Sequence, residues 1–384
     1  MMEYTKLKNI NEYISESINP AKFPSTLFEM YSVPIFETGH PEYLLGSKIA
    51  SNKTVVQKND VLLCKINPRI NRVWVVADES EHPNIASSEW IVVRSSKYHP
   101  EFLAWYFRSP KFKKLMVSEV AGIGGSLTRA QPKSVAEYPV PMLTLSEQDA
   151  IAAIFNRVDT IIKKRQQQLQ KLDKLVKARF VEMFGDPVTN PMDWPTKPLL
   201  EMGYCKNGMN FHTGDSGIEM HCLGVGDFKD YSVIDGTDYL PTISLNEAPP
   251  EESMLQDGDL VFVRSNGNKA LVGRCLLVYP HNTPTTYSGF CIRYRLTSAE
   301  VNIAYLLRVL KTDSMRKKMA GRGANIQNLN QQILATLNIP TPPLELQEWF
   351  TAFVEQIDKS KVAVQKALDE AQLLFDSLMQ KYFG

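Results

Sequence analysis

The 384-residue sequence lacks any long apolar run, and this absence excludes a membrane-spanning helix, which needs about 20 consecutive apolar residues. The N-terminus, MMEYTKLKNINEYI, carries acidic residues and no apolar segment, so it does not have the pattern of a secretory signal. The five cysteines are odd in number and have no CxxC spacing, which argues against a disulfide framework or a zinc knuckle. We therefore expect a cytoplasmic protein with reduced thiols.

Motifs of several enzyme classes are also missing. The chain has no GxxxxGK[ST] loop for a nucleoside triphosphate and no NPPY-type tetrapeptide of amino-methyltransferases, and its six histidines lack HExxH spacing. Asp227 and Asp230 are close enough for a carboxylate pair, but acidic residues in a loop are usually only solvated. The sequence thus predicts no catalytic residue, no metal site and no cofactor bound by this chain, and it favours a binding protein over an enzyme.

A strong net charge is absent too, because 43 basic and 42 acidic residues give +1. The composition, 43% apolar and 22% charged, is that of an average globular protein, and the length predicts two or three domains. The charge is unevenly distributed along the chain. Residues 146–185 hold eight basic and five acidic side chains, whereas residues 344–384 hold four and seven. These two segments carry opposite net charge.

An internal repeat with a period of 199 residues organises the chain. NDVLLCKIN at 59–67 aligns with GDLVFVRSN at 258–266, and AGIGGS at 121–126 aligns with AGRGAN at 320–325 without a gap. The same shift pairs Asp60 with Asp259, Lys65 with Arg264, Asn67 with Asn266, Pro141 with Pro340, Gln148 with Gln347 and Asp159 with Asp358. Because one register holds over more than 120 residues, we infer two copies of a domain followed by an arm.

The two domains, residues 1–145 and 186–343, share one order of patterns. β-Branched, strand-like runs (DVLLCKI, RVWVVAD and EWIVVR in the first domain, DLVFVRS, RCLLVYP and FCIRYRL in the second) precede an aromatic helical pattern. The helical patterns are PEFLAWYFRSPKFKKLM and VNIAYLLRVLKTDSMRKKM, and each leads to a Gly-rich loop and a Pro-rich stop. This order predicts an α/β (α+β) fold for each domain.

The arms, residues 146–185 and 344–384, are predicted to be long helices, with Ser146 in the N-cap region and Gly185 as the stop of the first. Apolar residues recur every seven positions: Phe155, Ile162, Leu169, Val176 and Met183, and then Phe350, Ile357, Val364, Ala371 and Leu378. Sustained heptads and opposite charge favour an antiparallel coiled coil, with the domains related by a pseudo-twofold axis. The alternative is two core helices in separate globular domains.

The Gly-rich loops and the loops after the central strand-like runs carry side chains of the types that can read nucleic acid. Arg pairs with guanine, Asn and Gln pair with adenine, and Gly lets the backbone approach closely. The first-domain candidates are Lys65, Asn67, Arg69, Arg72, Ser126, Thr128, Arg129, Gln131 and Lys133. The second-domain candidates are Arg264, Asn266, Asn268, Lys269, Arg274, Arg322, Asn325, Gln327, Asn328, Asn330 and Gln331. KFKK at 111–114 and RKK at 316–318 are predicted to face phosphates.

Ordinary polar surface loops are the alternative interpretation of these residues. The recurrence of such loops at the same place in both copies favours DNA binding. Two variable domains, each followed by a long helix, with MFGDPVTNP at 183–191 after the first helix and LLFDSLMQKYFG at 373–384 closing the second, resemble the specificity subunit of a Type I restriction-modification system. The resemblance covers essentially the whole chain.

The resemblance implies that each domain is a target recognition domain that reads one half of a bipartite site in double-stranded DNA. It implies that the helices space the half-sites and dock two modification subunits, which carry S-adenosylmethionine and methylate adenine. A restriction and translocation subunit would complete the complex. A two-domain protein-binding scaffold without DNA contact remains the alternative, favoured by the nearly neutral charge, and an enzyme with an unrecognised site is a third possibility.

Overall fold

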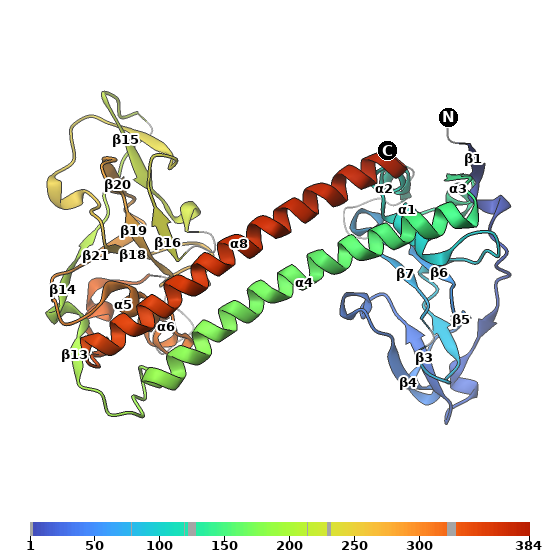
Figure 1. Ribbon diagram of the computed structural model, residues 1–384, viewed down its shortest axis with the longest axis horizontal. Coiled ribbons are helices and arrows are strands. Elements are labelled where there is room, and N and C mark those ends of the chain that lie inside the picture. Colours follow the sequence, from blue (N-terminus) through green and yellow to red (C-terminus); the bar gives the residue numbers. More distant parts are fainter. Residues whose placement is uncertain are drawn as a thin grey trace. The chain divides into compact units, whose positions relative to one another are not determined.

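The computed structural model describes residues 3–77, 79–118, 120–121, 128–212, 214–228, 232–320 and 328–384 (Figure 1). It divides into two compact units, of which unit 1 comprises Met1–Gln167 with Val364–Gly384 and unit 2 comprises Gln168–Ala363. Two long helices, α4 (Leu145–Phe184) and α8 (Leu344–Phe383), each contribute one part to each unit. Within the described residues, no helix is both long enough and apolar enough to span a membrane.

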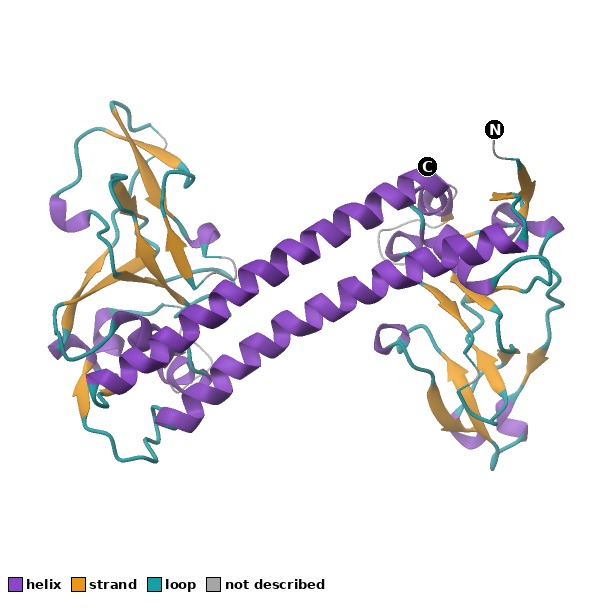
Figure 2. Cartoon of the chain, in the orientation of Figure 1, coloured by secondary structure: helices purple, strands orange, loops and turns teal. Residues whose placement is uncertain are grey.

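The first domain, which precedes α4 in unit 1, is built on two sheets (Figure 2). The five-stranded sheet has the order β2 (Ser17–Ile18), β5 (Lys53–Val55), β8 (Asn84–Ala86), β3 (Leu27–Tyr31) and β4 (Glu42–Leu45). The three-stranded sheet has the order β7 (Val73–Val75), β6 (Val61–Cys64) and β9 (Trp90–Val93). The remaining elements are the pairs β1 (Tyr4–Lys6) with β12 (Pro139–Pro141) and β10 (Val120–Ala121) with β11 (Arg129–Ala130), and the helices α1 (Pro100–Arg108), α2 (Pro110–Ser118) and α3 (Pro132–Val135).

The second domain, between α4 and α8, is also built on two sheets. Its five-stranded sheet has the order β14 (Gly203–Asn207), β21 (Cys291–Leu296), β18 (Asp259–Val263), β19 (Cys275–Tyr279) and β16 (Val233–Asp235). Its three-stranded sheet has the order β17 (Thr242–Leu245), β15 (Ile218–Leu223) and β20 (Thr285–Tyr287). The pair β13 (Thr196–Pro198) with β22 (Asn338–Pro340) and the helices α5 (Ile303–Leu310), α6 (Asp313–Ala320) and α7 (Gln331–Ala335) complete it.

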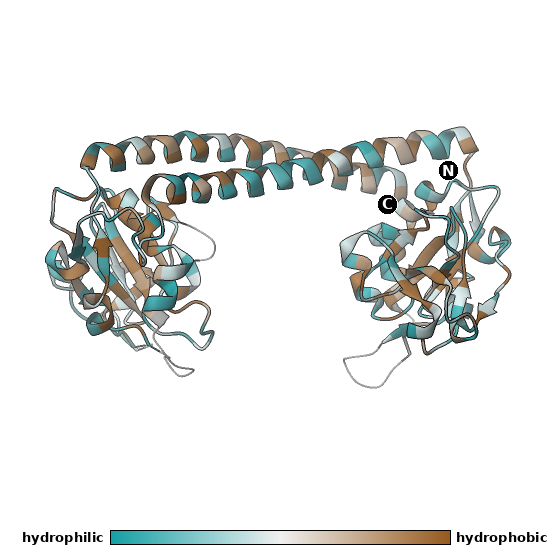
Figure 3. Ribbon diagram, turned by 90° about the horizontal axis from the view of Figure 1, so that it is seen from below, coloured by the Kyte–Doolittle hydropathy of each residue, from teal (hydrophilic) through white to brown (hydrophobic). Residues whose placement is uncertain are grey.

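Six strands of the first domain recur in the second, as the internal repeat predicted, although the sheets that contain them differ in size. The order β7-β6-β9 recurs as β19-β18-β21, and β4-β3-β8 recurs as β17-β15-β20 with the same antiparallel and parallel pairings. Brown, apolar segments concentrate in the strands inside each domain, while the long helices alternate brown and teal (Figure 3). Mixed sheets covered by helices confirm the predicted α/β (α+β) class.

The central strand of each domain is buried on both faces. In β6, Val61 and Leu63 face the cluster that contains α1, whereas Leu62 and Cys64 face the aromatic cluster of Tyr31, Trp74 and Trp90. In β18, Leu260 and Phe262 alternate in the same way with Val261 and Val263. A strand that is apolar at every position fits two opposed cores.

A buried carboxylate lies at the start of each central strand. Asp60 accepts two hydrogen bonds from Arg94, at 2.7 and 2.8 Å, and one from the backbone N–H of Gln57. Asp259 accepts two from Arg295, both at 2.8 Å, and one from the N–H of Gln256. The paired guanidinium and backbone donors compensate the cost of burying each charge.

A buried glutamine joins the start of each long helix to its domain. Gln148 accepts from the N–H of His99 and donates to the carbonyls of Lys97 and Leu143. Gln347, one period later, accepts from the N–H of Asn302 and donates to the carbonyls of Glu300 and Pro342. The pairing of Gln148 with Gln347 in the sequence therefore reflects one structural role built twice.

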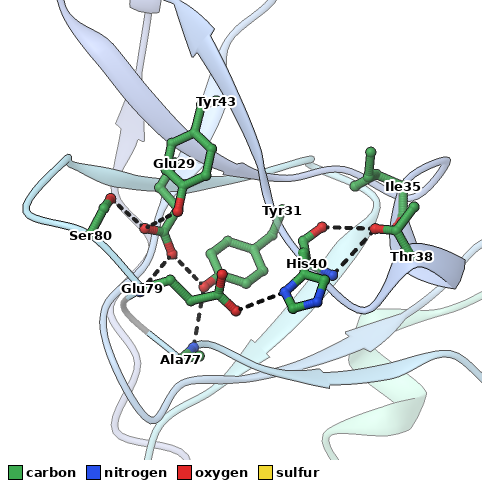
Figure 4. A network of polar contacts seen from close by, with 9 residues as sticks. All are labelled: Glu29, Tyr31, Ile35, Thr38, His40, Tyr43, Ala77, Glu79 and Ser80. Carbon is green, nitrogen blue, oxygen red and sulfur yellow. Dashed lines mark hydrogen bonds and ion pairs between the residues drawn. The ribbon is translucent and has the colours of Figure 1, made fainter.

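A polar network joins β3 to the segment that comes after β7 in the chain (Figure 4). The buried carboxylate of Glu29 accepts hydrogen bonds from Tyr31 Oη (2.7 Å), Ser80 Oγ (2.6 Å) and the N–H of Glu79 (3.2 Å). The hydroxyl of Tyr31 in turn accepts from the N–H of Ala77 at 3.2 Å. Burial opposes ionisation of Glu29, but these donors outweigh it and lower the pKa of the carboxyl below 4.5.

The predicted heptad positions of both helices point inward. Phe155, Ile162, Val176, Phe350 and Val364 are buried, and Leu169, Met183, Ile357, Ala371 and Leu378 are half-buried. In unit 1, Phe155 near the start of α4 stacks on Phe383 at the end of α8, with centroids 5.4 Å apart. In unit 2, Phe184 at the end of α4 lies 5.4 Å from Phe350 near the start of α8. The helices therefore run antiparallel within each unit, as predicted.

The ion pair between the two helices does not follow from their opposite net charges. In unit 2, Lys361 Nζ of the acidic α8 lies 2.6 Å from Asp173 Oδ1 of the basic α4, so this ion pair runs opposite to the net-charge difference. Both side chains are partly exposed, and such pairs contribute about 0–1 kcal/mol. The apolar heptad positions dominate the contact.

Two local expectations about helices were wrong. The cap of α4 is Thr144 rather than Ser146, because Thr144 Oγ1 accepts from the N–H of Glu147 while the Glu147 carboxylate accepts from the N–H of Thr144. Each aromatic helical pattern forms two helices, α1 and α2 or α5 and α6. Ser109, before Pro110, is extended (ψ 149°) because proline disfavours a helical residue before it. Gly185 is confirmed as the stop of α4, with φ +74°.

Candidate nucleic-acid interface

Backbone hydrogen bonds join the two predicted loops of the first domain. The loop after β6 begins at Lys65, whose carbonyl accepts from the N–H of Ala130 at 2.8 Å. Asn67 adopts a left-handed conformation (φ 47°), and its N–H donates to the carbonyl of Thr128 at 2.8 Å. These contacts hold the segment that ends the first Gly-rich loop against the loop that carries Arg69 and Arg72.

The first-domain candidates differ in exposure. Arg69, Arg129, Gln131 and Lys133 are exposed, and Lys65, Asn67, Arg72 and Thr128 are half-buried. The Arg72 side chain is only 17% exposed, and its guanidinium lies 3.8 Å from Glu37. Arg72 therefore points largely into the domain. Ser126 lies outside the described residues.

Backbone hydrogen bonds join the corresponding loops of the second domain. The carbonyl of Arg264 accepts from the N–H of Leu329 at 2.7 Å, and Ser265 forms an antiparallel bridge with Asn328. Arg264 and Leu329 lie one period of 199 residues after Lys65 and Ala130, and they form the same backbone hydrogen bond. The same loop junction is therefore built in each domain.

Several second-domain amides serve the local backbone. Asn266 Oδ1 accepts from the N–H of Asn268, Asn268 Oδ1 accepts from that of Ala270, and Asn330 Oδ1 caps α7 through the N–H of Ile333. The side-chain NH2 groups of these asparagines are separate from the oxygens used in these contacts and carry two donors each. Asn268, Lys269, Asn328 and Asn330 are exposed, whereas Arg264, Asn266, Arg274 and Gln331 are half-buried. Arg322, Asn325 and Gln327 lie outside the described residues, as does Asp230 of the carboxylate pair considered above.

An open pocket lies beside the second loop junction. Its volume is about 340 Å³, and it is lined by Ser265, Asn266, Gly267, Lys269, Phe290 and Asn328. Phe290 is 61% exposed, which is unusual for a phenylalanine among polar side chains. The polar lining and the exposed ring suit a ligand with both hydrogen-bonding edges and apolar surface.

Two residues of these junctions, Glu89 and Phe290, were missed by the sequence analysis. From β6 to β9 the first copy is two residues shorter than the second copy is from β18 to β21. The strand β9 therefore matches β21 with a shift of 201, as the pairs Cys64–Trp90 and Val263–Cys291 show. Matching the repeat through the arginines at 94 and 295 would have found both positions. Glu89 binds Arg129 through two hydrogen bonds, and this hydrogen bonding raises the pKa of Arg129.

The basic clusters on the domain helices have mixed surroundings. Lys113 and Lys114 of α2 are exposed, but Lys111 Nζ donates to Tyr4 Oη at 3.3 Å and to the carbonyl of Gly384 at 3.2 Å. Lys317 and Lys318 of α6 are exposed, and Arg316 donates to the carbonyl of Ala270. Their orientation toward phosphates stays a prediction.

Chemistry that would indicate catalysis is sparse in the part of the chain that the structure describes. No group of three or more His, Cys, Asp or Glu side chains there could hold a metal ion. All five cysteines are free thiols, and burial raises the pKa of Cys222 and Cys291 to about 12. The carboxylate of Asp227 accepts a hydrogen bond from the N–H of Gly224 at 2.8 Å.

Comparison with known proteins points to one family. A family model described as the Type I restriction modification DNA specificity domain matches residues 248–371. The StySPI specificity subunit of Salmonella potsdam is 25% identical over 307 residues, which cover 74% of this chain and 65% of that protein. The chain thus spans just under two thirds of that relative. The MjaVIII specificity subunit of Methanocaldococcus jannaschii is 21% identical over 348 residues, covering 83% and 79%.

Solved structures extend the likeness to the whole fold. A chain solved in work on complex assembly and conformational transition of the type I R-M system has a TM-score of 0.61 at 20% identity, covering 100% of this chain and 97% of that one. The S subunit of a Type I system from M. genitalium has a TM-score of 0.57 at 13% identity, covering 100% and 96%. These findings show that the chain is similar to specificity subunits of Type I restriction-modification systems and shares their fold.

Proposed function

We propose that this chain is the non-catalytic DNA-recognition subunit of a Type I complex, in which the first domain reads one half of a bipartite site and the second reads the other. The observation that carries the proposal is the loop junction built twice, by Lys65 with Ala130 and by Arg264 with Leu329. Each junction presents exposed basic and amide side chains on a rigid sheet, as base and phosphate recognition requires.

Footprinting of the assembled complex on its DNA target tests the division of labour. Arg69→Ala should weaken protection in one half-site, and Lys269→Ala should weaken it in the other, because the two residues belong to different domains. Equal loss in both halves from either variant would contradict the assignment of one domain to one half-site.

Protein partners are proposed from the surface of the long helices. We propose that two modification subunits dock there, that these subunits hold S-adenosylmethionine and methylate adenine, and that a restriction and translocation subunit completes the complex. In unit 2, Trp349 is 49% exposed and borders an open pocket of about 500 Å³ with Arg179, Met183 and Leu346. The Arg179 guanidinium lies 4.6 Å above the Trp349 ring. Exposed Trp and Arg are typical anchors of protein interfaces.

The competing function is a protein-binding scaffold without DNA contact. The nearly neutral charge and the exposed Trp349 favour it. Salt separates the two functions, because the affinity for DNA should fall linearly in a log–log plot as phosphate counterions are released. An assembled complex that shows no DNA affinity at low salt would support the scaffold.

A further inference from the structure

The two domains place different side chains at the same two backbone positions. The N–H of Lys65 donates to the carbonyl of Glu89 at 3.0 Å, and the N–H of Arg264 donates to the carbonyl of Phe290 at 2.8 Å. The bridge between Ile66 and Arg129 likewise corresponds to the bridge between Ser265 and Asn328. Glu89 and Arg129 in the first domain are thus equivalent to Phe290 and Asn328 in the second.

In the first domain, one edge of the Arg129 guanidinium is held by Glu89. Nε donates to Oε2 at 3.2 Å, and Nη2 donates to Oε1 at 3.0 Å. The outer edge keeps both N–H groups of Nη1 and one of Nη2, and the side chain is 46% exposed. Two parallel N–H groups on a fixed plane match the O6 and N7 acceptors of guanine in the major groove. The carboxylate orients the arginine and so reduces the entropy lost on binding.

In the second domain, the corresponding pair offers a ring and an amide. The backbone of Phe290 is fixed, since its carbonyl accepts from the N–H groups of Arg264 and Ser265 and its own N–H donates to Ser288 Oγ. Phe290 is 61% exposed and lines the open pocket together with Asn328. An amide pairs with N6 and N7 of adenine, and an apolar side chain contacts the methyl group of thymine.

We propose that these two positions are a specificity-determining pair, in which Glu89 and Arg129 make the first domain select a G·C pair while Phe290 and Asn328 make the second domain select an A·T pair at the equivalent place. This inference rests on the proposed function and adds the residues and the base pairs that distinguish the two halves. Glu89 is a positioning residue that acts through Arg129.

The test uses the chain assembled with its modification subunits, with methylated sites sequenced and competitor duplexes carrying every base pair at each target position. Arg129→Lys keeps the charge but loses the planar fork, so discrimination at one G·C pair of the first half-site should fall about 10- to 100-fold. Glu89→Gln should lower the same discrimination, and neither variant should change the second half-site. The matched control is Glu137→Gln, which removes an exposed carboxylate that is paired with Lys6 and Lys8 and forms part of neither junction.

The exchange variant Phe290→Glu with Asn328→Arg should shift one position of the second half-site from A·T toward G·C. Circular dichroism and the melting temperature identify any variant that fails to fold. The base preferences of the folded variants then test the proposed pair. Unchanged base preference in folded Arg129→Lys and in the exchange variant would overturn the pair, while the wild-type complex would still show a bipartite target. A wild-type complex without any bipartite target would instead overturn the proposed function itself.

Discussion

Single side chains stabilise this fold through buried polar contacts, and Glu29 offers the clearest test. Glu29→Gln replaces an acceptor-only carboxylate with an amide that faces the donors Tyr31, Ser80 and the N–H of Glu79. Unsatisfied buried donors cost about 1–3 kcal/mol, so the free energy of unfolding should fall by about that amount at pH 7. Urea denaturation measures the change, and Glu81→Gln, an exposed neighbour, is the control.

The same carboxylate gives a pH dependence of defined sign. The pKa of Glu29 is lowered in the folded protein, so its stabilising contribution is complete above the unfolded value of 4.5 and is lost as the pH falls through the lower folded value. The difference in unfolding free energy between wild type and Glu29→Gln should therefore be constant near neutrality and should shrink below about pH 4.5. A difference that grows with acidification would refute this account.

Residue types at the loop junctions could be predicted from the sequence, but their partners could not. The pattern named Arg129, Asn266 and Asn330 as polar candidates. The structure shows that Asn266 and Asn330 use their amide oxygens locally and that Arg129 is held by Glu89. Such partners come from other strands, whose register depends on loop lengths that periodicity does not report.

At the scale of elements, the long helices were the most predictable part because a seven-residue repeat needs no knowledge of tertiary partners. Their ends were less certain: Gly185 was predicted correctly, whereas the cap is Thr144 because only that residue forms a reciprocal pair with Glu147. The break between α1 and α2 at Pro110 was visible in the sequence but was outweighed by the aromatic pattern.

The stop of α4 can be tested with a matched glycine. Gly185 has φ +74°, and an added Cβ would lie 2.6 Å from Cγ of Pro191, whereas Gly39 has φ +76° with nothing within 4 Å. A left-handed residue with a Cβ costs about 1–2 kcal/mol, so Gly39→Ala should show this cost alone. Gly185→Ala should lose more, because Pro191 must also move. Equal shifts in the urea midpoints of the two variants would show that Pro191 yields without cost.

At the scale of the whole molecule, the repeat was the most informative sequence feature, because it predicted the duplicated domain before any strand was known. The strands β6 and β18, the carboxylates Asp60 and Asp259 and the glutamines of the long helices all obey the period of 199. The period fails by two residues at Glu89 and Phe290. Insertions concentrate in loops, where neither burial nor hydrogen bonding constrains the length, and there the two copies acquire different side chains.

The continuity of α4 and α8 through both units leads to the last prediction. Each helix has 40 residues, or about 60 Å, and we propose that this length sets the spacing between the half-sites. Inserting one heptad into each helix, after Gln167 and after Ala363, keeps the apolar register and adds about 10.5 Å. At about 3.4 Å per base pair, the spacer of the methylated target should lengthen by about three base pairs.

Sequencing of methylated sites produced by the assembled complex measures the spacer directly. The same heptad placed in α4 alone makes the pairing of Phe155 with Phe383 incompatible with that of Phe184 with Phe350, so it should lower the melting temperature rather than give a new spacer. A folded double-insertion complex that methylates sites with the original spacer would show that the length of the helices does not determine the spacing. In that case, the distance between half-sites would have to be set by the partner subunits or by bending of the DNA.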